Sequence, residues 1–212
     1  MSEMSIEKAP AETTPAAPAD HGHGHDSAVA HNENLKFAMW LYLASEVVIF
    51  ATLIANYILF RLHSPEAVQE FHKEAGVGLV SLNTFLLLTS SWAMVMGLQQ
   101  IRRGNSKGLV RWIGLTAVLG AVFVGLQYVE YKELAAAGFT IYSSEFGMRF
   151  YAPTAFHGAH VIVGVLWALF VVRNGLKGRY SAENNIGVEI FGLYWHFVDV
   201  VWILLFTLIY LI

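Results

Sequence analysis

The sequence Tyr194-Trp195-His196-Phe197-Val198-Asp199-Val200-Val201-Trp202 places a histidine and an aspartate inside an apolar stretch near the end of the chain. The surrounding segment, residues 188–212, is long and apolar enough to span the hydrocarbon core of a membrane. An ionisable side chain exposed to lipid costs about 2.5 kcal/mol or more, so such residues normally face protein. The stretch therefore predicts a membrane helix that turns a polar face toward other helices.

Four more segments have the length and apolar character of a membrane span. A spanning helix needs about 20 mostly apolar residues, and the predicted spans are residues 37–60, 77–101, 109–131, 151–172 and 188–212. Pro153 falls in the first turn of the fourth span, where its missing N–H is harmless. Short connections favour antiparallel neighbours. The sequence thus predicts an all-α, polytopic membrane helix bundle with five transmembrane helices.

The composition supports a membrane protein and excludes several kinds of chemistry. The chain is 56% hydrophobic and 14% charged, whereas a soluble domain carries roughly a quarter charged residues. The formal net charge of −3 gives no basis for nucleic-acid binding. Because the chain has no cysteine, disulfides, thiolate nucleophiles and iron–sulfur clusters are excluded.

The first 35 residues differ from everything that follows. They are rich in Ala, Pro and His and contain no apolar run, which predicts a disordered tail (1–35) ahead of a single five-helix domain (36–212). The tail lacks the basic start and apolar core of a secretory signal peptide. Its histidines His21, His23 and His25 could chelate a metal, although we favour a flexible polar leader.

The distribution of basic residues predicts the orientation. In the five-span topology, nine of the 13 Lys and Arg residues lie on the side of the N-terminus and four on the other side. Loops rich in Lys and Arg stay in the cytoplasm. We therefore expect the N-terminus to be cytoplasmic and the C-terminus to lie outside.

Polar residues recur at helical spacing within three spans, and residues at such spacing share one face of a helix. In each span the residues are separated by three or four positions. The third span has Thr116, Gly120, Phe123, Gln127 and Glu130, the fourth has Pro153, His157, His160 and Gly164, and the fifth has Glu189, Gly192, His196 and Asp199. We favour a buried hydrogen-bond network that fixes helix register. From their depths we expect Glu130 to pair with His157, and His196 to have Asp199 as its neighbour. A metal or haem held by His157, His160 and His196 is the alternative.

Glu46 is a carboxylic acid in the mainly apolar run 41–54, with no basic residue within two turns along the chain. Burial without a nearby cation favours the protonated form of a carboxyl group. That form suits proton handling or reaction with a hydrophobic carboxyl reagent, and membership of the network is the alternative. We expect Glu46 to lie near the midplane, at the level of His160, His196 and Asp199.

Several motifs resemble those of one family along residues 36–212. Ser45-Glu46-Val47, Leu82-Asn83-Thr84 and Gln127-Tyr128-Val129-Glu130-Tyr131 are similar to its shorter motifs. Phe156-His157-Gly158-Ala159-His160-Val161 and the stretch 194–202 match its most specific ones. The chain resembles subunit III of the haem-copper terminal oxidases, in the shortened five-helix bacterial form. Many members have seven helices, and this chain begins at what resembles their third, so another subunit could supply the missing pair.

The resemblance implies an accessory subunit of the bacterial plasma membrane that has no cofactor or metal of its own. Subunits I and II would be its partners, with the haems and copper, and a cleft between its helices would bind phospholipids. By resemblance, Glu46 is the carbodiimide-reactive carboxylate linked to proton uptake, and Arg173 is a candidate for an anionic lipid headgroup. The residues expected to line or brace the cleft are Glu130, His157, His160, Trp195, His196, Asp199 and Trp202.

The electron donor of the complex is open between cytochrome c and a quinol. Glu46 and Phe156 favour the cytochrome c branch, because quinol oxidase relatives tend to have Asp and Thr at these positions. A quinol oxidase subunit III is the alternative, and a homologue associated with nitric oxide reductase is a third. Two other functional classes are considered: a metal or haem enzyme that acts without partner subunits, and an ion transporter that acts without them.

Overall fold

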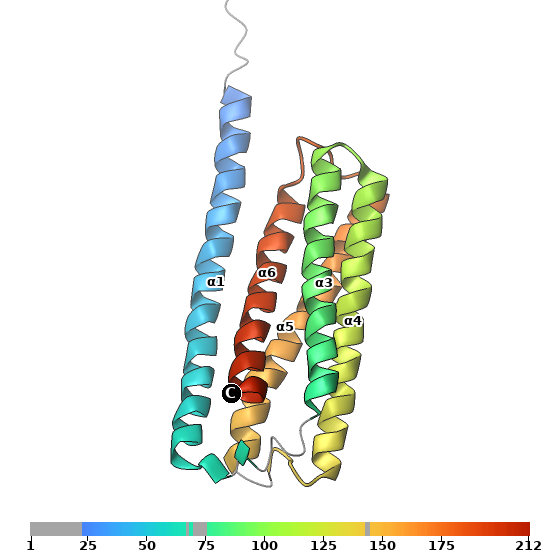
Figure 1. The fold of residues 1–212 in the computed structure, drawn as a ribbon. Coiled ribbons are helices and arrows are strands. Elements are labelled where there is room, and N and C mark those ends of the chain that lie inside the picture. The colour runs from blue at the N-terminus through green and yellow to red at the C-terminus, as the bar shows by residue number, and fades with distance from the viewer. Residues whose placement is uncertain (1–22, 67, 70–75, 143–144) are drawn as a thin grey trace, which may run out of the picture.

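The protein is a bundle of long helices (Figure 1). The computed structural model describes residues 23–66, 68–69, 76–142 and 145–212. Its main elements are α1 (His23–His63), α3 (Val77–Arg102), α4 (Ser106–Ala136), α5 (Glu145–Leu176), α6 (Ile186–Phe206) and the π-helix η1 (Thr207–Leu211). Five helices in this part of the chain are long and apolar enough to cross a membrane. The prediction of an all-α bundle with five spans is confirmed.

The first helix is longer than the predicted span, since it begins at His23 rather than at residue 37. Residues 23–35, which we had assigned to the tail, are therefore helical. Residues 1–22 lie outside the described part, so a disordered tail there stays a prediction. The side chains of His21, His23 and His25 also lie outside it.

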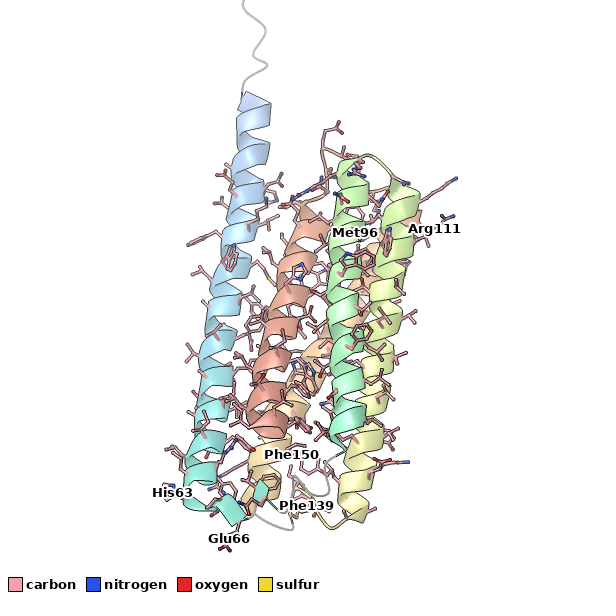
Figure 2. The ribbon with its side chains drawn as sticks, viewed as in Figure 1. His63, Glu66, Met96, Arg111, Phe139 and Phe150 are labelled. Atoms are coloured by element: carbon pink, nitrogen blue, oxygen red, sulfur yellow. The ribbon has the colours of Figure 1, made fainter. Side chains whose placement is uncertain are left out.

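Pro153 is inside α5 rather than in its first turn, which corrects the sequence-based expectation. The helix begins at Glu145, and the added turns bury Phe146 and Phe150, whose rings stack with centroids 6.0 Å apart. Phe139 joins them at this end of the bundle, 6.1 Å from Phe146 (Figure 2). An interior proline costs about 3 kcal/mol, which the burial of two phenylalanine side chains at about 1.5–3 kcal/mol each can offset.

Four of the helices form a compact unit, and α1 is added to one side of it (Figure 1). In this unit α3 packs against α4, α4 against α5, and α6 against both α3 and α5. The contacts of α3 with α4, α4 with α5 and α5 with α6 follow the expectation that neighbours in sequence pack together, whereas the contact of α3 with α6 joins helices far apart in the sequence. The first helix instead packs mainly along α5 and α6. It does so through a stripe of buried side chains: Met39, Leu43, Glu46, Phe50, Tyr57 and Phe60.

Small residues let the helices of the unit approach closely around Trp195. A Cβ added at Gly120 on α4 would lie 2.7 Å from the Trp195 ring, and one added at Gly164 on α5 would lie 2.6 Å from it. Larger side chains at either position would collide with the indole, which is fully buried. A glycine from each of two predicted polar stripes, on α4 and α5, thus makes room for Trp195 of the C-terminal motif.

Candidate functional site

Glu46 meets a histidine from a different helix. Its Oε2 lies 3.3 Å from Nε2 of His160 on α5, and the two side chains are only 12% and 11% exposed. The other ring nitrogen of His160, Nδ1, lies 2.8 Å from the carbonyl oxygen of Phe156. The rings of Phe156 and Phe50 pack against the imidazole, with centroids 4.7 and 5.4 Å from it. Packing therefore brings an imidazole close to Glu46, but the contact does not have the geometry of a hydrogen bond.

His196 and Asp199 do not join this pair, although all four groups were expected at one depth. Nδ1 of His196 lies 2.7 Å from the hydroxyl of Ser91 on α3. Asp199 is also close to Ser91, but neither of its carboxylate oxygens makes a hydrogen bond of good geometry with a residue that the structure describes. The expected contact between His196 and Asp199 is replaced by a shared neighbour, because α3 packs directly against this face of α6.

The expected pair of Glu130 and His157 is wrong. The hydroxyl of Tyr210 donates a 2.6 Å hydrogen bond to Oε1 of Glu130. His157 is instead enclosed by aromatic rings, with Trp202 stacked at 5.0 Å and Phe123 edge-on at 5.8 Å. Neither nitrogen of His157 has a hydrogen-bond partner among the described residues. The Trp202 ring that stacks on His157 lies 6.5 Å from the ring of Tyr210, so the two side chains have linked surroundings but no bond to each other.

Tyr210 is a site residue that the sequence did not reveal. It belongs to η1, where the wider π-turn closes with a hydrogen bond of 3.1 Å from the N–H of Ile212 to the carbonyl of Thr207. A π-turn changes the direction in which the following side chains point, relative to a continued α-helix. Near the end of a predicted span, a tyrosine is equally typical of the aromatic belt at the membrane surface. No signal in the sequence separates the two roles.

The two tryptophans of the C-terminal motif join α6 to α3. Nε1 of Trp195 donates to the hydroxyl of Ser90 at 3.0 Å, and Nε1 of Trp202 donates to the hydroxyl of Thr84 at 2.9 Å. Both indoles and Ser90 are buried. Each contact gives an indole N–H a hydrogen-bond partner that the hydrocarbon chains of lipid could not provide. These are hydrogen bonds between helices of the kind that fix helix register.

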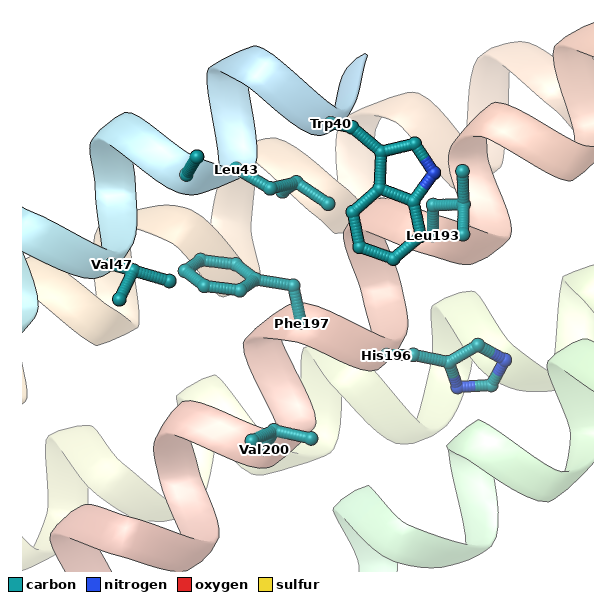
Figure 3. Close-up of a pocket in the computed structure, with 8 residues that line it drawn as sticks. Trp40, Leu43, Val47, Leu193, His196, Phe197 and Val200 are labelled. Carbon is teal, nitrogen blue, oxygen red and sulfur yellow. The ribbon is translucent and has the colours of Figure 1, made fainter. Parts of the chain in front are cut away.

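An apolar groove runs between α1 and α6. The part of the groove nearer the N-terminus of α1 has a volume of about 470 Å³. Here Trp40, Leu43 and Val47 of α1 and Leu193, Phe197 and Val200 of α6 line it (Figure 3). A second hollow of about 380 Å³ continues along the same two helices toward Ile58 and Leu208. Walls of this kind can accept a hydrocarbon chain.

Charged residues stand at the N-terminal end of this groove. Lys36 of α1 and Arg102 of α3 converge on Glu189 of α6, at 2.5 and 2.6 Å. The three side chains line a hollow of about 240 Å³ that shares Trp40 and Leu193 with the groove. Arg173 lies apart from them, exposed in the last turn of α5.

The three membrane histidines do not converge on a common centre. His160 faces Glu46, His157 is enclosed by Trp202 and Phe123, and His196 points from α6 toward α3 (Figure 3). Within the described ranges, no group of three or more His, Cys, Asp or Glu residues could hold a metal ion. The arrangement does not match the metal site that the spacing of these histidines had left open.

The fold and these contacts define a multi-pass membrane protein whose buried ionisable side chains face neighbouring helices. The family model described as cytochrome c oxidase subunit III matches residues 18–212. The chain therefore belongs to the cytochrome c oxidase subunit III family, the accessory subunits of haem-copper oxidases, and the resemblance found in the sequence is confirmed. Membership implies other oxidase subunits in the same complex.

Curated relatives come from both branches of the family. Cytochrome c oxidase subunit 3 of Synechocystis sp. is 39% identical over 191 residues, which cover 90% of this chain and 79% of the relative. The subunit of the same name from Bacillus sp. strain PS3 is 36% identical, over 97% of this chain and 96% of the relative. Cytochrome bo(3) ubiquinol oxidase subunit 3 of Pseudomonas aeruginosa is 34% identical, over 91% and 90%.

Proposed function

We propose that this chain is the non-redox subunit III of a bacterial cytochrome c oxidase in the plasma membrane. Subunits I and II would hold the haems and copper, and this chain would brace the catalytic subunit. The observation that carries the proposal is that the polar residues of the family motifs meet side chains of neighbouring helices, as in the contacts of Trp195 with Ser90 and of Trp202 with Thr84. Such contacts build a scaffold.

Cytochrome c is the proposed electron donor. Glu46 and Phe156 support it, as do the cytochrome c oxidase subunits at 36–39% identity. The quinol oxidase relative at 34% identity keeps a quinol as the alternative. The test is to purify the native complex through this chain, record its reduced-minus-oxidised spectrum, and compare turnover with reduced cytochrome c and with a quinol. Absence of haem-containing subunits from the complex would refute the proposal, and turnover with quinol alone would select the alternative.

We also propose that the groove between α1 and α6 binds a phospholipid. The apolar walls suit an acyl chain, and the two cations around Glu189 suit an anionic headgroup at the cytoplasmic end. Arg173 is a second candidate for a headgroup. In a lipid extract of the purified complex, Leu193→Trp and Val200→Trp, which would fill the groove, are expected to lower the amount of bound phospholipid, whereas an unchanged amount argues against this site.

The remaining proposals concern topology and the buried acid. A cytoplasmic N-terminus and an outer C-terminus are supported by the excess of basic residues on one side, and reporter fusions at the two ends would test them. A flexible tail, now limited to residues 1–22 because α1 begins at His23, would be tested by limited proteolysis of the complex. Glu46 would support proton uptake during turnover, since it is a buried carboxyl group near the middle of its helix.

A further inference from the structure

A smaller groove lies between α4 and α5, away from the groove that we assign to lipid. It has a volume of about 240 Å³ and is lined by residues of these two helices, among them Gln127 and Tyr128 of α4 and Ala155, Gly158 and Ala159 of α5. Tyr128 is 60% exposed, and Ala155 and Ala159 are exposed as well. The α4–α5 groove is therefore open at the surface of the bundle.

The side-chain amide of Gln127 has a fixed orientation in this groove. The carbonyl oxygen of Thr154 can only accept a hydrogen bond, so the amide atom 3.2 Å from it must be the nitrogen, Nε2. Nε2 also donates to the hydroxyl of Tyr131 at 3.1 Å. The two hydrogen bonds of Gln127 with described residues thus use both hydrogens of Nε2, and its oxygen, Oε1, keeps its acceptor capacity.

Oε1 of Gln127 faces α5 across the α4–α5 groove. A Cβ added at Gly158 would lie 2.9 Å from this oxygen, so a larger residue at position 158 would press against it. The side chain of Gln127 is otherwise buried, with the residue 4% exposed. The groove therefore has an unused hydrogen-bond acceptor where α4 and α5 meet.

The depth of Gln127 decides what can satisfy this acceptor. Gln127 lies six residues from the middle of α4 (Ser106–Ala136), which is about 9 Å along the helix. The hydrocarbon core extends about 15 Å to each side of the bilayer centre. An acyl chain has no hydrogen to donate, and an unsatisfied polar group in hydrocarbon is strongly unfavourable. Oε1 thus favours an occupant that brings a hydrogen-bond donor.

The walls of the groove suit a helix. Ala155, Gly158 and Ala159 are small, and small residues four positions apart allow the backbones of two membrane helices to approach closely. The lining residues cover positions 124–131 and 155–162, which is about 10 Å along each helix. The two hollows between α1 and α6 instead extend over positions 40–58 of α1, which is about 27 Å. A short contact is typical of helices that cross at an angle, whereas the longer groove follows the direction of an acyl chain.

We propose that the α4–α5 groove receives a transmembrane helix of another oxidase subunit, and that this helix places a hydroxyl, amide or indole hydrogen on Oε1 of Gln127. The small side chains of α5 let the partner helix come close, and the amide oxygen fixes its register. The site stands on its geometry, whereas the identity of the partner as an oxidase subunit rests on the proposed function.

The test uses photo-crosslinking in the intact purified complex. A short diazirine side chain is introduced at position 159 by genetic code expansion and activated by light, and the products are identified by mass spectrometry. We expect an adduct with a peptide from a transmembrane segment of another subunit, and a donor side chain within one helical turn of the attachment point. Position 118 is the matched control, because Val118 is 59% exposed on α4 and does not line the groove. It should give adducts with lipid.

A substitution that fills the groove gives a second measurement. Ala159→Trp should cause the loss of the crosslinked subunit from the purified complex, because the indole occupies the space that the partner helix needs. Ala159 is exposed in this chain, so the larger side chain does not have to enter the core of the bundle. Val118→Trp adds the same indole outside the groove and should retain every subunit.

The proposal is overturned if position 159 gives adducts only with phospholipid or with a second copy of this chain, or if it gives no polypeptide adduct. Wild-type subunit content in the Ala159→Trp complex would also overturn it. If that variant does not assemble, the crosslinking decides by itself. A crosslinked partner helix in a complex without haem would refute the proposed function while confirming the docking site.

Discussion

Replacing Gly120 by alanine should destabilise the bundle, whereas the same change at Gly125 on the same helix should not. A Cβ at Gly120 would lie 2.7 Å from the Trp195 ring and 2.9 Å from Cγ2 of Val165, closer than real Cβ contacts. A Cβ at Gly125 would meet no atom within 4 Å. The two variants add the same methyl group to α4, so only its surroundings differ.

The collision at Gly120 has no easy relief. The Trp195 indole also lies against Gly164, where a Cβ would lie 2.6 Å away, and its Nε1 is bound to Ser90 at 3.0 Å. Overpacking of this kind costs about 1–3 kcal/mol. Alanine in a helix interior gains about 0.5–1 kcal/mol over glycine, and both variants share that gain. We therefore expect Gly120→Ala to be about 1–3 kcal/mol less stable than Gly125→Ala.

The assay is the temperature at which this chain dissociates from the purified complex, followed by the tryptophan fluorescence of the protein and by retention of the chain on the complex. For a chain of this size, 1 kcal/mol corresponds to about 2–4 °C. Gly120→Ala should dissociate several degrees below Gly125→Ala, which should match the wild type or exceed it. Equal midpoints for the two variants would refute the packing around Trp195.

Three further outcomes are expected. Tyr210→Phe should destabilise the complex by about 1–3 kcal/mol, because it leaves the buried carboxylate of Glu130 without its 2.6 Å donor; thermal dissociation measures it. Trp202→Phe and Thr84→Val should each lower stability, and together by less than their sum, because each change alone already breaks the bond between them; a double-mutant cycle measures the coupling. Glu46→Ala should leave initial turnover largely intact but reduce the number of turnovers before inactivation, read from oxygen consumption over time.

Each of these expectations has an outcome that contradicts it. A Tyr210→Phe complex as stable as one carrying Tyr142→Phe, a change at a tyrosine that is 96% exposed, would show that the bond to Glu130 contributes nothing. Strict additivity in the double-mutant cycle would deny the contact with Thr84. Immediate loss of all activity in an assembled Glu46→Ala complex would show that this acid takes part in every turnover.

The number of helices and their polar faces could be predicted because these are local properties. Length and apolar character decide whether a segment can cross a membrane, and all five spans were found in this way. Helical spacing predicted that His157 and His160 share one face of their helix, and that His196 and Asp199 share one face of theirs. The start of α5 was misplaced, since Pro153 in the first turn is the commoner arrangement and only the aromatic packing of Phe146 and Phe150 shows the helix continuing upstream.

The partners of the buried groups could not be predicted, because they depend on how whole helices are rotated and placed against each other. The amino-acid pattern was enough to predict that Glu46 lies in an apolar span, that three histidines lie within the membrane, and that the chain belongs to the oxidase subunit family. The packing of the helices was needed to show that α1 lies on α5 and α6, which places the imidazole of His160 beside Glu46, and that Tyr210, in the π-helix, reaches Glu130. A hydrogen bond between helices requires two side chains within about 3 Å, and spacing along one helix carries no information about the rotation of another.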